Sequence, residues 1–320
     1  MKQGDKKTSF SIGFYNYIKS FREHPKAGSH QFLLQREALL GSFQYLRSKA
    51  VIKEYSEKDT LFCSIPSCLP EHIRRTMKRM FIRSEFLQAA HSGGKNIFDF
   101  NSIFDGVREE APLYSSSVIY RLLDYNPSEM NFLGRLGEGE SRGCERLIKY
   151  NELLAKDIQI LKILVEEFNI EVTALIPYCK TIDEADFVKR AIRAAIPNIR
   201  IGLMVETFTC LESLFDYMPV CTAFLGSSDL LADYECIDRS NIDYTQFHEL
   251  TGMNKRVIKA LENQLPKIYK LGHMMEICTC KDLNSLRMDS TYNVSRTYTP
   301  DQLVLSDDEY MQKFGTKAIG

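Results

Sequence analysis

Two carboxylates follow short apolar runs in the second half of the chain. Residues 201–205 lead into Glu206, and residues 222–225 lead through a short turn to Asp229. Nearly continuous apolar runs of this length are typical of strands buried on both faces of a parallel sheet. In a barrel of such strands the active site lies at the C-terminal ends, so the two carboxylates would form an oxygen-rich site suited to Mg²⁺. The alternative is that each acid only caps the following helix or lies at a solvated loop end.

The elements around these residues alternate between strand and helix. Strands are predicted at 9–14, 31–34, 117–123, 170–176, 201–205, 222–225 and 273–277. Helices are predicted at 144–168, 183–195, 210–217 and 254–271, and residues 41–112 are mostly helical in pattern. This alternation indicates an α/β fold with a parallel sheet. The seven units are one short of a complete ring. We predict a single-domain (β/α)8 TIM barrel over residues 1–300, with a tail at 301–320 that packs on it or extends it.

The composition argues against several classes of function. A net charge of −1 gives no electrostatic basis for binding nucleic acid or an anionic membrane. No apolar run reaches the roughly 18 residues of a membrane span, and the N-terminus lacks the apolar core of a signal peptide. The nine cysteines are scattered and several lie in apolar runs, which indicates reduced thiols and a cytoplasmic protein. Cys278 and Cys280 have no second pair with which to form a zinc site.

The stretch from Ile199 to Arg239 resembles a pattern of the phosphoenolpyruvate-utilising enzymes, namely phosphoenolpyruvate synthase, pyruvate phosphate dikinase and enzyme I of the sugar phosphotransferase system. That pattern is approximately M-x-E-x-P, then G-[TS]-N-D-[LM]-T-Q, then D-R. The residues that fall at the family spacing without a gap are Gly226, Asp229, Leu230, Asp238 and Arg239. The resemblance is to the phosphoenolpyruvate/pyruvate-binding barrel of these enzymes.

Further segments resemble the same barrel. RLLDYNPSE at 121–129 is similar to R-L-S-D-F-K-S-N-E, and RGCER at 142–146 is similar to R-G-x-x-R. IPYCKTIDEA at 176–185 is similar to I-P-F-V-R-T-V-D-Q-A, and GHMMEICT at 272–279 is similar to the family's last barrel strand, G-K-x-x-G-I-C-G. A family strand that ends L-x-R-x-E would lie at 31–37. Glu37 matches it, but Arg36 stands one position late and would point to the opposite face.

The resemblance implies a set of site residues. Glu206 and Asp229 would ligate Mg²⁺ or Mn²⁺, and Cys278, at the end of the eighth strand, would be the catalytic acid/base. The implied substrate-binding residues are Arg121, Arg142, Arg239 and Ser228. The residues alone leave alternatives open. These are an ion pair between Arg121 and Asp124, a capping or pairing role for Arg146 within the following helix, and a small buried thiol at position 278.

Three classes of function follow from the resemblance and its departures. The three arginines favour phosphotransferase chemistry on phosphoenolpyruvate or pyruvate through an enolate. The family's phosphohistidine and nucleotide domains have no counterpart here, so this transferase reading requires a partner protein that carries them. The second class is a magnesium-dependent C–C lyase or aldolase acting on a pyruvate-like oxo acid. Ser228 in place of Asn and Thr279 in place of Gly favour the third, a non-catalytic ligand-sensing or partner-binding relic. We expect a homo-oligomer in each case.

Overall fold

The structure of the chain is a computed structural model. It describes residues 59–69, 71–75, 78–91, 99–125, 141–214, 216–217, 222–226, 263, 274–278 and 294–298. For the strand segments 222–226, 274–278 and 294–298, only the backbone is described.

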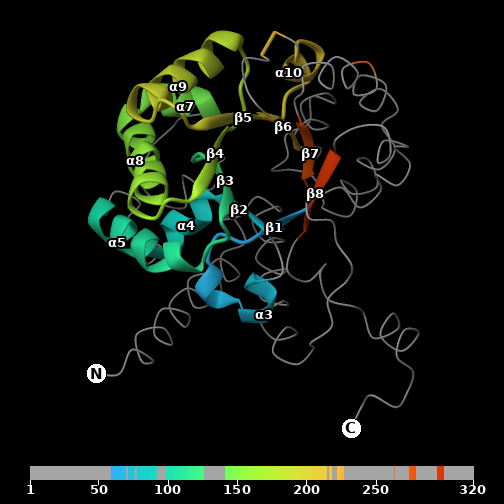
Figure 1. Ribbon diagram of the computed structural model, residues 1–320. Helices are drawn as coiled ribbons and strands as arrows, with labels where there is room; N and C mark the ends of the chain where they lie inside the picture. The colour runs from blue at the N-terminus through green and yellow to red at the C-terminus, as the bar shows by residue number, and fades with distance from the viewer. Residues whose placement is uncertain are drawn as a thin grey trace, which may run out of the picture.

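Eight parallel strands form a closed barrel in sequence order, β1 to β8, and β1 pairs with β8 to complete the ring (Figure 1). The strands are β1 (Thr60–Phe62), β2 (Arg79–Arg83), β3 (Ser117–Arg121), β4 (Glu171–Ile176), β5 (Arg200–Val205), β6 (Thr222–Gly226), β7 (Met274–Cys278) and β8 (Val294–Tyr298). Every neighbouring pair is parallel. The predicted (β/α)8 barrel fold is therefore confirmed.

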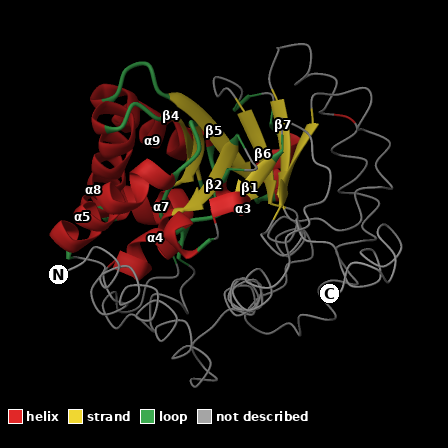
Figure 2. Cartoon of the chain, turned by 60° about the horizontal axis from the view of Figure 1, so that its bottom comes forward, coloured by secondary structure: helices red, strands yellow, loops and turns green. Residues whose placement is uncertain are grey.

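Helices follow the strands and cover the outside of the ring, most completely beside β2 to β5 (Figures 1 and 2). The α-helices are α3 (Glu71–Arg74), α4 (Ser84–His91), α5 (Phe100–Glu110), α7 (Gly143–Lys149), α8 (Asn151–Lys162), α9 (Ile182–Ala195) and α10 (Phe208–Glu212). The 3₁₀ turns η1 (Pro66–Cys68) and η2 (Ala111–Leu113) and a π-helical turn, η3 (Ile163–Glu167), complete the list. None of the described helices combines the length and hydrophobicity that a membrane span needs.

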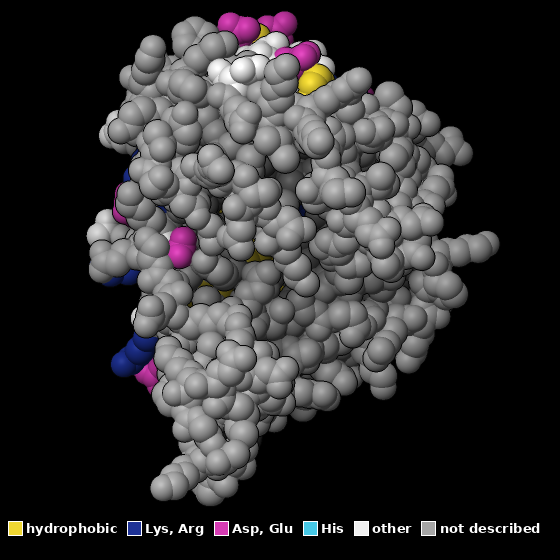
Figure 3. Space-filling view, turned by 90° about the vertical axis from the view of Figure 1, so that its right-hand side faces the viewer, with side chains coloured by type: hydrophobic (Ala, Val, Ile, Leu, Met, Phe, Trp, Pro, Cys, Tyr) yellow, Lys and Arg dark blue, Asp and Glu magenta, His cyan; other side chains and the backbone are white. Residues whose placement is uncertain are grey.

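The core lies between the strands and this helical layer. The middle residues of β3, β4 and β5 are buried on both faces of the sheet, as their apolar runs predict. The helices face them with amphipathic stripes, such as Leu153, Ile160 and Leu161 of α8. On the face shown in Figure 3, the described side chains are mainly charged or polar, and they show only small hydrophobic areas.

Three of the barrel strands differ from the sequence prediction. β1 and β2 lie in residues 41–112, which were expected to be mostly helical, and β8 follows the strand that was expected to be the last. β1 has three residues and β2 five, which is too short for periodicity to separate strand from helix. β8 reads VSRTY and contains no apolar run. The strands predicted at 9–14 and 31–34 lie outside the described residues.

Two further expectations are corrected. Cys278 is the last residue of β7, the seventh strand, because β8 intervenes before the ring closes on β1. The single helix expected over 144–168 is instead divided at Tyr150, whose backbone (φ −121°, ψ 75°) is not helical, and it ends in the π-helical turn η3.

Candidate functional site

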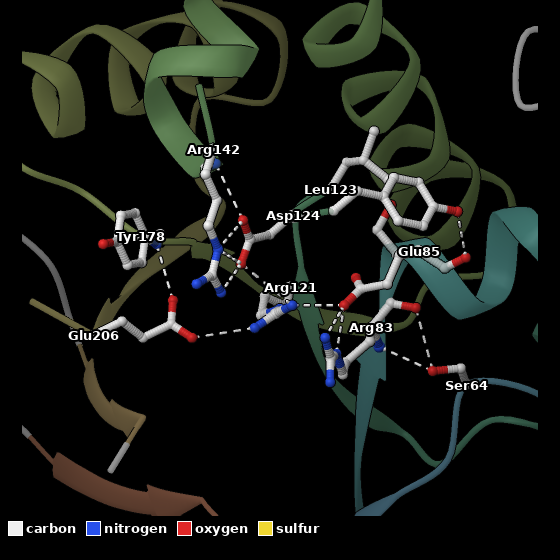
Figure 4. Close-up of polar contacts among 12 residues, drawn as sticks. Ser64, Arg83, Glu85, Arg121, Leu123, Asp124, Arg142, Tyr178 and Glu206 are labelled. Carbon is white, nitrogen blue, oxygen red and sulfur yellow. Dashed lines mark hydrogen bonds and ion pairs between the residues drawn. The ribbon is translucent and has the colours of Figure 1, made fainter. Parts of the chain in front are cut away.

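Charged side chains from four barrel segments meet at the C-terminal ends of the strands, where the active sites of this fold lie (Figure 4). Arg83 is the last residue of β2, Arg121 is the last residue of β3, and Glu206 directly follows β5. Glu85, Asp124 and Arg142 join them. We call these six residues, Arg83, Glu85, Arg121, Asp124, Arg142 and Glu206, the charged cluster.

Glu85 separates two arginines that the sheet places side by side. Arg83 and Arg121 are direct partners in the β2–β3 register, and like charges at such positions repel. The chain turns from β2 straight into α4, which puts Glu85 in the first helical turn beside them. Its Oε1 accepts from Arg121 Nη2 at 2.6 Å and also pairs with Arg83. One carboxylate oxygen therefore holds both guanidinium groups in place.

Arg121 connects the carboxylates of three segments. Besides Glu85, its Nη2 lies 3.5 Å from Asp124 Oδ2, and its Nη1 donates to Glu206 Oε1 at 3.3 Å. The residue is 4% exposed. Burial by itself would lower the pKa of Arg121, but the three carboxylates together raise it above its ordinary value. Arg121 is thus a fixed positive charge in the centre of the cluster (Figure 4).

Arg142 and Asp124 form a two-pronged ion pair. Arg142 Nη2 donates to Asp124 Oδ2 at 2.8 Å, and Nε donates to Oδ1 at 3.0 Å. The N–H of Gly143 also donates to Oδ1, at 3.1 Å. Burial would raise the pKa of Asp124, but Arg142 and then Arg121 outweigh it and hold the pKa well below its ordinary range. The guanidinium also stacks on the ring of Tyr178, with Cζ 4.4 Å from its centroid.

Glu206 is held by one donor on each oxygen. Arg121 donates to Oε1, and the backbone N–H of Tyr178 donates to Oε2 at 3.0 Å. Tyr178 adopts a positive φ of 28°, which is uncommon for a residue with a side chain. Glu206 is 1% exposed, and each of its oxygens has one donor among the described residues, which leaves a second acceptor position because a carboxylate oxygen has two lone pairs.

A second polar network supports the end of β3. Asp157 of α8 accepts from the backbone N–H of Leu123 at 2.7 Å, one residue before Asp124. Its other oxygen accepts from Ser84, Gln88 and Tyr120 at 2.6–2.8 Å. Burial raises the pKa of Asp157, although these donors oppose the shift. The network fastens β3 and α4 to α8, and so it fixes the position of the charged cluster.

The charged cluster has no net charge, since three arginines face three carboxylates. Two of its buried polar atoms have no hydrogen-bond partner among the described residues, namely Glu85 Oε2 and Arg121 Nε. An unsatisfied buried polar group costs about 1–3 kcal/mol, so such atoms are uncommon away from ligand sites. Oε2 of Glu85 can therefore accept, and Nε of Arg121 can donate, a hydrogen bond to a bound group.

The donor set fits a hard divalent cation. Among the described residues, Glu206 offers carboxylate oxygens whose second lone pairs have no partner, which is the ligand type that such a cation prefers, whereas Glu85 lies on the other side of Arg121 (Figure 4). No group of three or more His, Cys, Asp or Glu side chains suited to holding a metal occurs within the described residues. Mg²⁺ does not need one, because it is commonly bound through one or two carboxylates together with water and substrate oxygens.

The structure brings together three of the residues expected in the site, which are Arg121, Arg142 and Glu206. Arg121 does contact Asp124, as the ion-pair alternative stated, but it also contacts Glu85 and Glu206. Arg146 is structural, because its guanidinium bonds the backbone carbonyls of Tyr125 and Ser141. Cys278 ends a strand at the same mouth. The remaining expected residues, Ser228, Asp229 and Arg239, lie outside the described residues, as do Arg36 and Glu37.

Three residues of the site were missed in the sequence. Arg83 and Glu85 have the R-x-E spacing of the family strand that was sought at 31–37, and Phe81 stands where that pattern has Leu. The signal was present, but the segment had been assigned to a helical region. Asp157 carries no motif and lies within a helix, so only the fold reveals its contact with Leu123.

Comparison with known proteins adds little beyond the fold. No protein-family model and no curated protein matches the sequence. Similar solved structures include a citrate synthase, SbnG, with 10% identity, covering 80% of this chain and 89% of that chain, at a TM-score of 0.44. They also include an HpcH/Hpal aldolase/citrate lyase family protein from Burkholderia cenocepacia J2315, with 12% identity, 85% and 95% coverage and a TM-score of 0.41. A third is an HpcH/HpaI aldolase from Desulfitobacterium hafniense DCB-2, with 11% identity, 81% and 90% coverage and a TM-score of 0.38.

Likenesses at these TM-scores carry no argument about function. The barrel is established by its own closed ring of strands. No comparison confirms the resemblance to phosphoenolpyruvate-utilising enzymes.

Proposed function

We propose that this barrel is a divalent-metal-dependent C–C lyase or aldolase that acts on a pyruvate-like 2-oxo acid through its enolate. The observation that carries the proposal is the neutral, buried charged cluster at the C-terminal mouth, in which each of the three arginines is already paired with a carboxylate.

Charge balance favours a dianion in this site. Three arginines and three carboxylates cancel, and the expected pair of Asp229 and Arg239 also cancels. A divalent cation would leave two positive charges in a low-dielectric region, where charge must be closely compensated. The enolate of pyruvate carries two negative charges, one on the carboxylate and one on the enolate oxygen. Phosphoenolpyruvate carries a third, for which the three arginines of the cluster offer no spare charge.

The chain's own groups have distinct roles in this proposal. Arg142 keeps Asp124 in place, and Nε of Arg121, which has no partner among the described residues, would donate to the substrate oxygen on which negative charge develops. Glu206, with Asp229, would hold the metal ion, which polarises a carbonyl oxygen when bound. The thiol of Cys278 would carry the proton to or from the substrate carbon. The burial of the cluster excludes water from these charges.

The phosphotransfer reading has less support. It needs arginines that neutralise a phosphoryl group. Arg83 and Arg121 are already paired with Glu85, and Arg142 is paired with Asp124 through a two-pronged contact. A phosphoryl group would have to displace buried carboxylates from these partners, which costs several kcal/mol.

The test is exchange of the pyruvate methyl protons with deuterium, followed by NMR with and without Mg²⁺ or Mn²⁺. We expect metal-dependent exchange, and release of pyruvate from 4-hydroxy-2-oxo acids, which are the aldol products of a pyruvate enolate. Glu206→Gln should lower the exchange rate about 100-fold or more. The matched control is Glu171→Gln, because Glu171 begins β4 at the opposite end of the barrel, where it is exposed and paired with Arg200.

Two results would contradict the proposal. Pyruvate binding without any exchange would indicate the ligand-sensing relic. Transfer of the phosphoryl group of phosphoenolpyruvate to a histidine-containing partner would indicate phosphotransferase chemistry. If the Cys278→Ser variant keeps the full rate of proton exchange, the proposed reaction stands but another group carries out the proton transfer.

A further inference from the structure

Two buried cysteines lie in contact next to the charged cluster. Cys144 is in the first turn of α7, and Cys179 is in the loop after β4. Their sulfur atoms are 2.9 Å apart, and both side chains are fully buried. Both thiols also lie against one acceptor, the carbonyl of Pro177, at 3.2 Å and 3.6 Å from Sγ. The two sulfurs are therefore held facing each other by a shared backbone partner.

The same two segments carry residues of the site. Cys144 N–H donates to Tyr178 O at 3.4 Å, and the Arg142 guanidinium stacks on the Tyr178 ring. Tyr178 N–H in turn donates to Glu206. The two thiols thus touch where α7 meets the β4–α9 loop, and the same two segments hold Arg142 and Glu206.

We propose that Cys144 and Cys179 form an oxidation site, at which a peroxide converts the thiol pair into a disulfide that latches α7 to the β4–α9 loop. Hydrogen peroxide transfers one oxygen to the first sulfur, which becomes a sulfenic acid, and one water is released. The second thiol then attacks that sulfur, the S–S bond forms, and a second water leaves. Both thiols lose their protons, two electrons pass to the peroxide, and the sulfurs move only a short way to reach bonding distance.

The reaction is slow at neutral pH and faster at alkaline pH. Burial raises the pKa of both thiols above the ordinary value, and the thiolate is the reactive form. Because the cross-link joins positions 35 residues apart, it restricts the unfolded chain and stabilises the fold. It leaves Arg142 and Glu206 in place, since the two segments already touch.

The experiment treats the purified full-length chain with hydrogen peroxide at alkaline pH, digests it without reduction, and maps the cross-linked peptides by mass spectrometry. We expect a peptide pair that joins Cys144 to Cys179 and has lost two hydrogen atoms. The midpoint of thermal unfolding should rise by about 5 °C and should return to its starting value after treatment with dithiothreitol.

Matched variants separate this pair from the other thiols. Cys144→Ser and Cys179→Ser should lose both the cross-link and the rise in midpoint, while Cys63→Ser, which removes another buried thiol, should keep both. A cross-link between Cys179 and Cys210 would overturn the assignment. The assignment would also be overturned if Cys144 and Cys179 stayed reduced in wild-type protein while the other cysteines were oxidised. The mass measurement uses no substrate, so its failure is distinguishable from failure of the proposed lyase activity.

Discussion

At the scale of single residues, the charged cluster shows that one carboxylate can compensate the electrostatic repulsion between two neighbouring arginines. The barrel register sets Arg83 beside Arg121, and Glu85 lies between them with one oxygen on both. The second oxygen of Glu85 has no partner among the described residues. A cluster that served only to stabilise the fold would not be expected to contain an unpaired buried oxygen, because apolar residues in place of a buried ion pair are often at least as stable.

The first prediction concerns Arg121. Replacing Arg121 with Met removes the central positive charge and leaves Glu85, Asp124 and Glu206 buried with less compensation. We expect the free energy of unfolding to fall by about 3–5 kcal/mol. Urea unfolding followed by circular dichroism measures the change.

The matched control for Arg121 is Arg108. Arg108 also pairs with a carboxylate, through a two-pronged contact with Glu167 at 2.8 Å and 3.0 Å, but the two side chains are 40% and 42% exposed. Arg108→Met should therefore cost only a small fraction of the stability that Arg121→Met costs. Equal losses in the two variants would show that burial of the cluster is not what makes its ion pairs important.

At the scale of elements, the sequence predicts best where strands are long and apolar. β3, β4 and β5 carry continuous apolar runs, and each was placed to within two residues. β1, β2 and β8 were missed because their short, mixed sequences become strands only through pairing with neighbours in a closed ring. The error had a consequence for the site, since assigning residues 41–112 to helices concealed Arg83 and Glu85. Arg121, Asp124, Arg142 and Glu206 each stand in a local motif and are predicted from the sequence. The pairing of Arg121 with Glu85 and of Arg142 with Asp124 depends on tertiary structure.

The second prediction concerns the start of α7. Gly143 has a φ of +56°, and a Cβ there would lie 2.5 Å from the carbonyl oxygen of Tyr178. Gly143→Ala should therefore destabilise the fold by at least about 1 kcal/mol and move Arg142 away from Asp124. Binding of pyruvate, measured by calorimetry, should weaken. Glu145→Gln, an exposed change two residues further along the same helix, should leave pyruvate binding unaltered. If the Gly143→Ala variant binds pyruvate as tightly as the wild type, Arg142 does not belong to the site.

At the scale of the whole molecule, the barrel gathers residues that are distant in sequence. Three strands, β3 to β5, lie between Arg83 and Glu206 in the chain. Glu206 nevertheless pairs with Arg121, and Arg83 shares Glu85 with Arg121, because all the strands are parallel and end at one mouth. The stability of the molecule and the geometry of the site are therefore coupled. Acid that protonates a carboxylate of the cluster weakens the packing of β3 and α7 as well as the site.

The third prediction is the pH dependence of that coupling at Asp124. Its pKa in the folded state lies well below the ordinary value of about 3.9, because Arg142 and Arg121 favour the carboxylate. A depressed folded pKa contributes stability that is fully present above the unfolded pKa and is lost as the pH falls through the folded value. Asp157 and Glu110 act in the opposite sense, since burial raises their pKa values, so the stability of the wild type alone does not isolate Asp124.

Comparison of wild type with Asp124→Asn isolates this contribution. At pH 7 the variant should be less stable by on the order of 2 kcal/mol. The difference should narrow progressively below about pH 4, because Asp124 of the unfolded wild type then binds a proton that the folded carboxylate does not yet bind. Urea unfolding at a series of pH values measures the difference. Asp105→Asn is the control, because Asp105 is exposed and makes only a surface contact with Arg108, and its difference from wild type should stay small throughout. A gap between wild type and Asp124→Asn that keeps its full size down to pH 3 would mean that the Asn variant loses packing rather than charge. Asp124 would then act as a shape-determining residue and not as the anionic partner of Arg142.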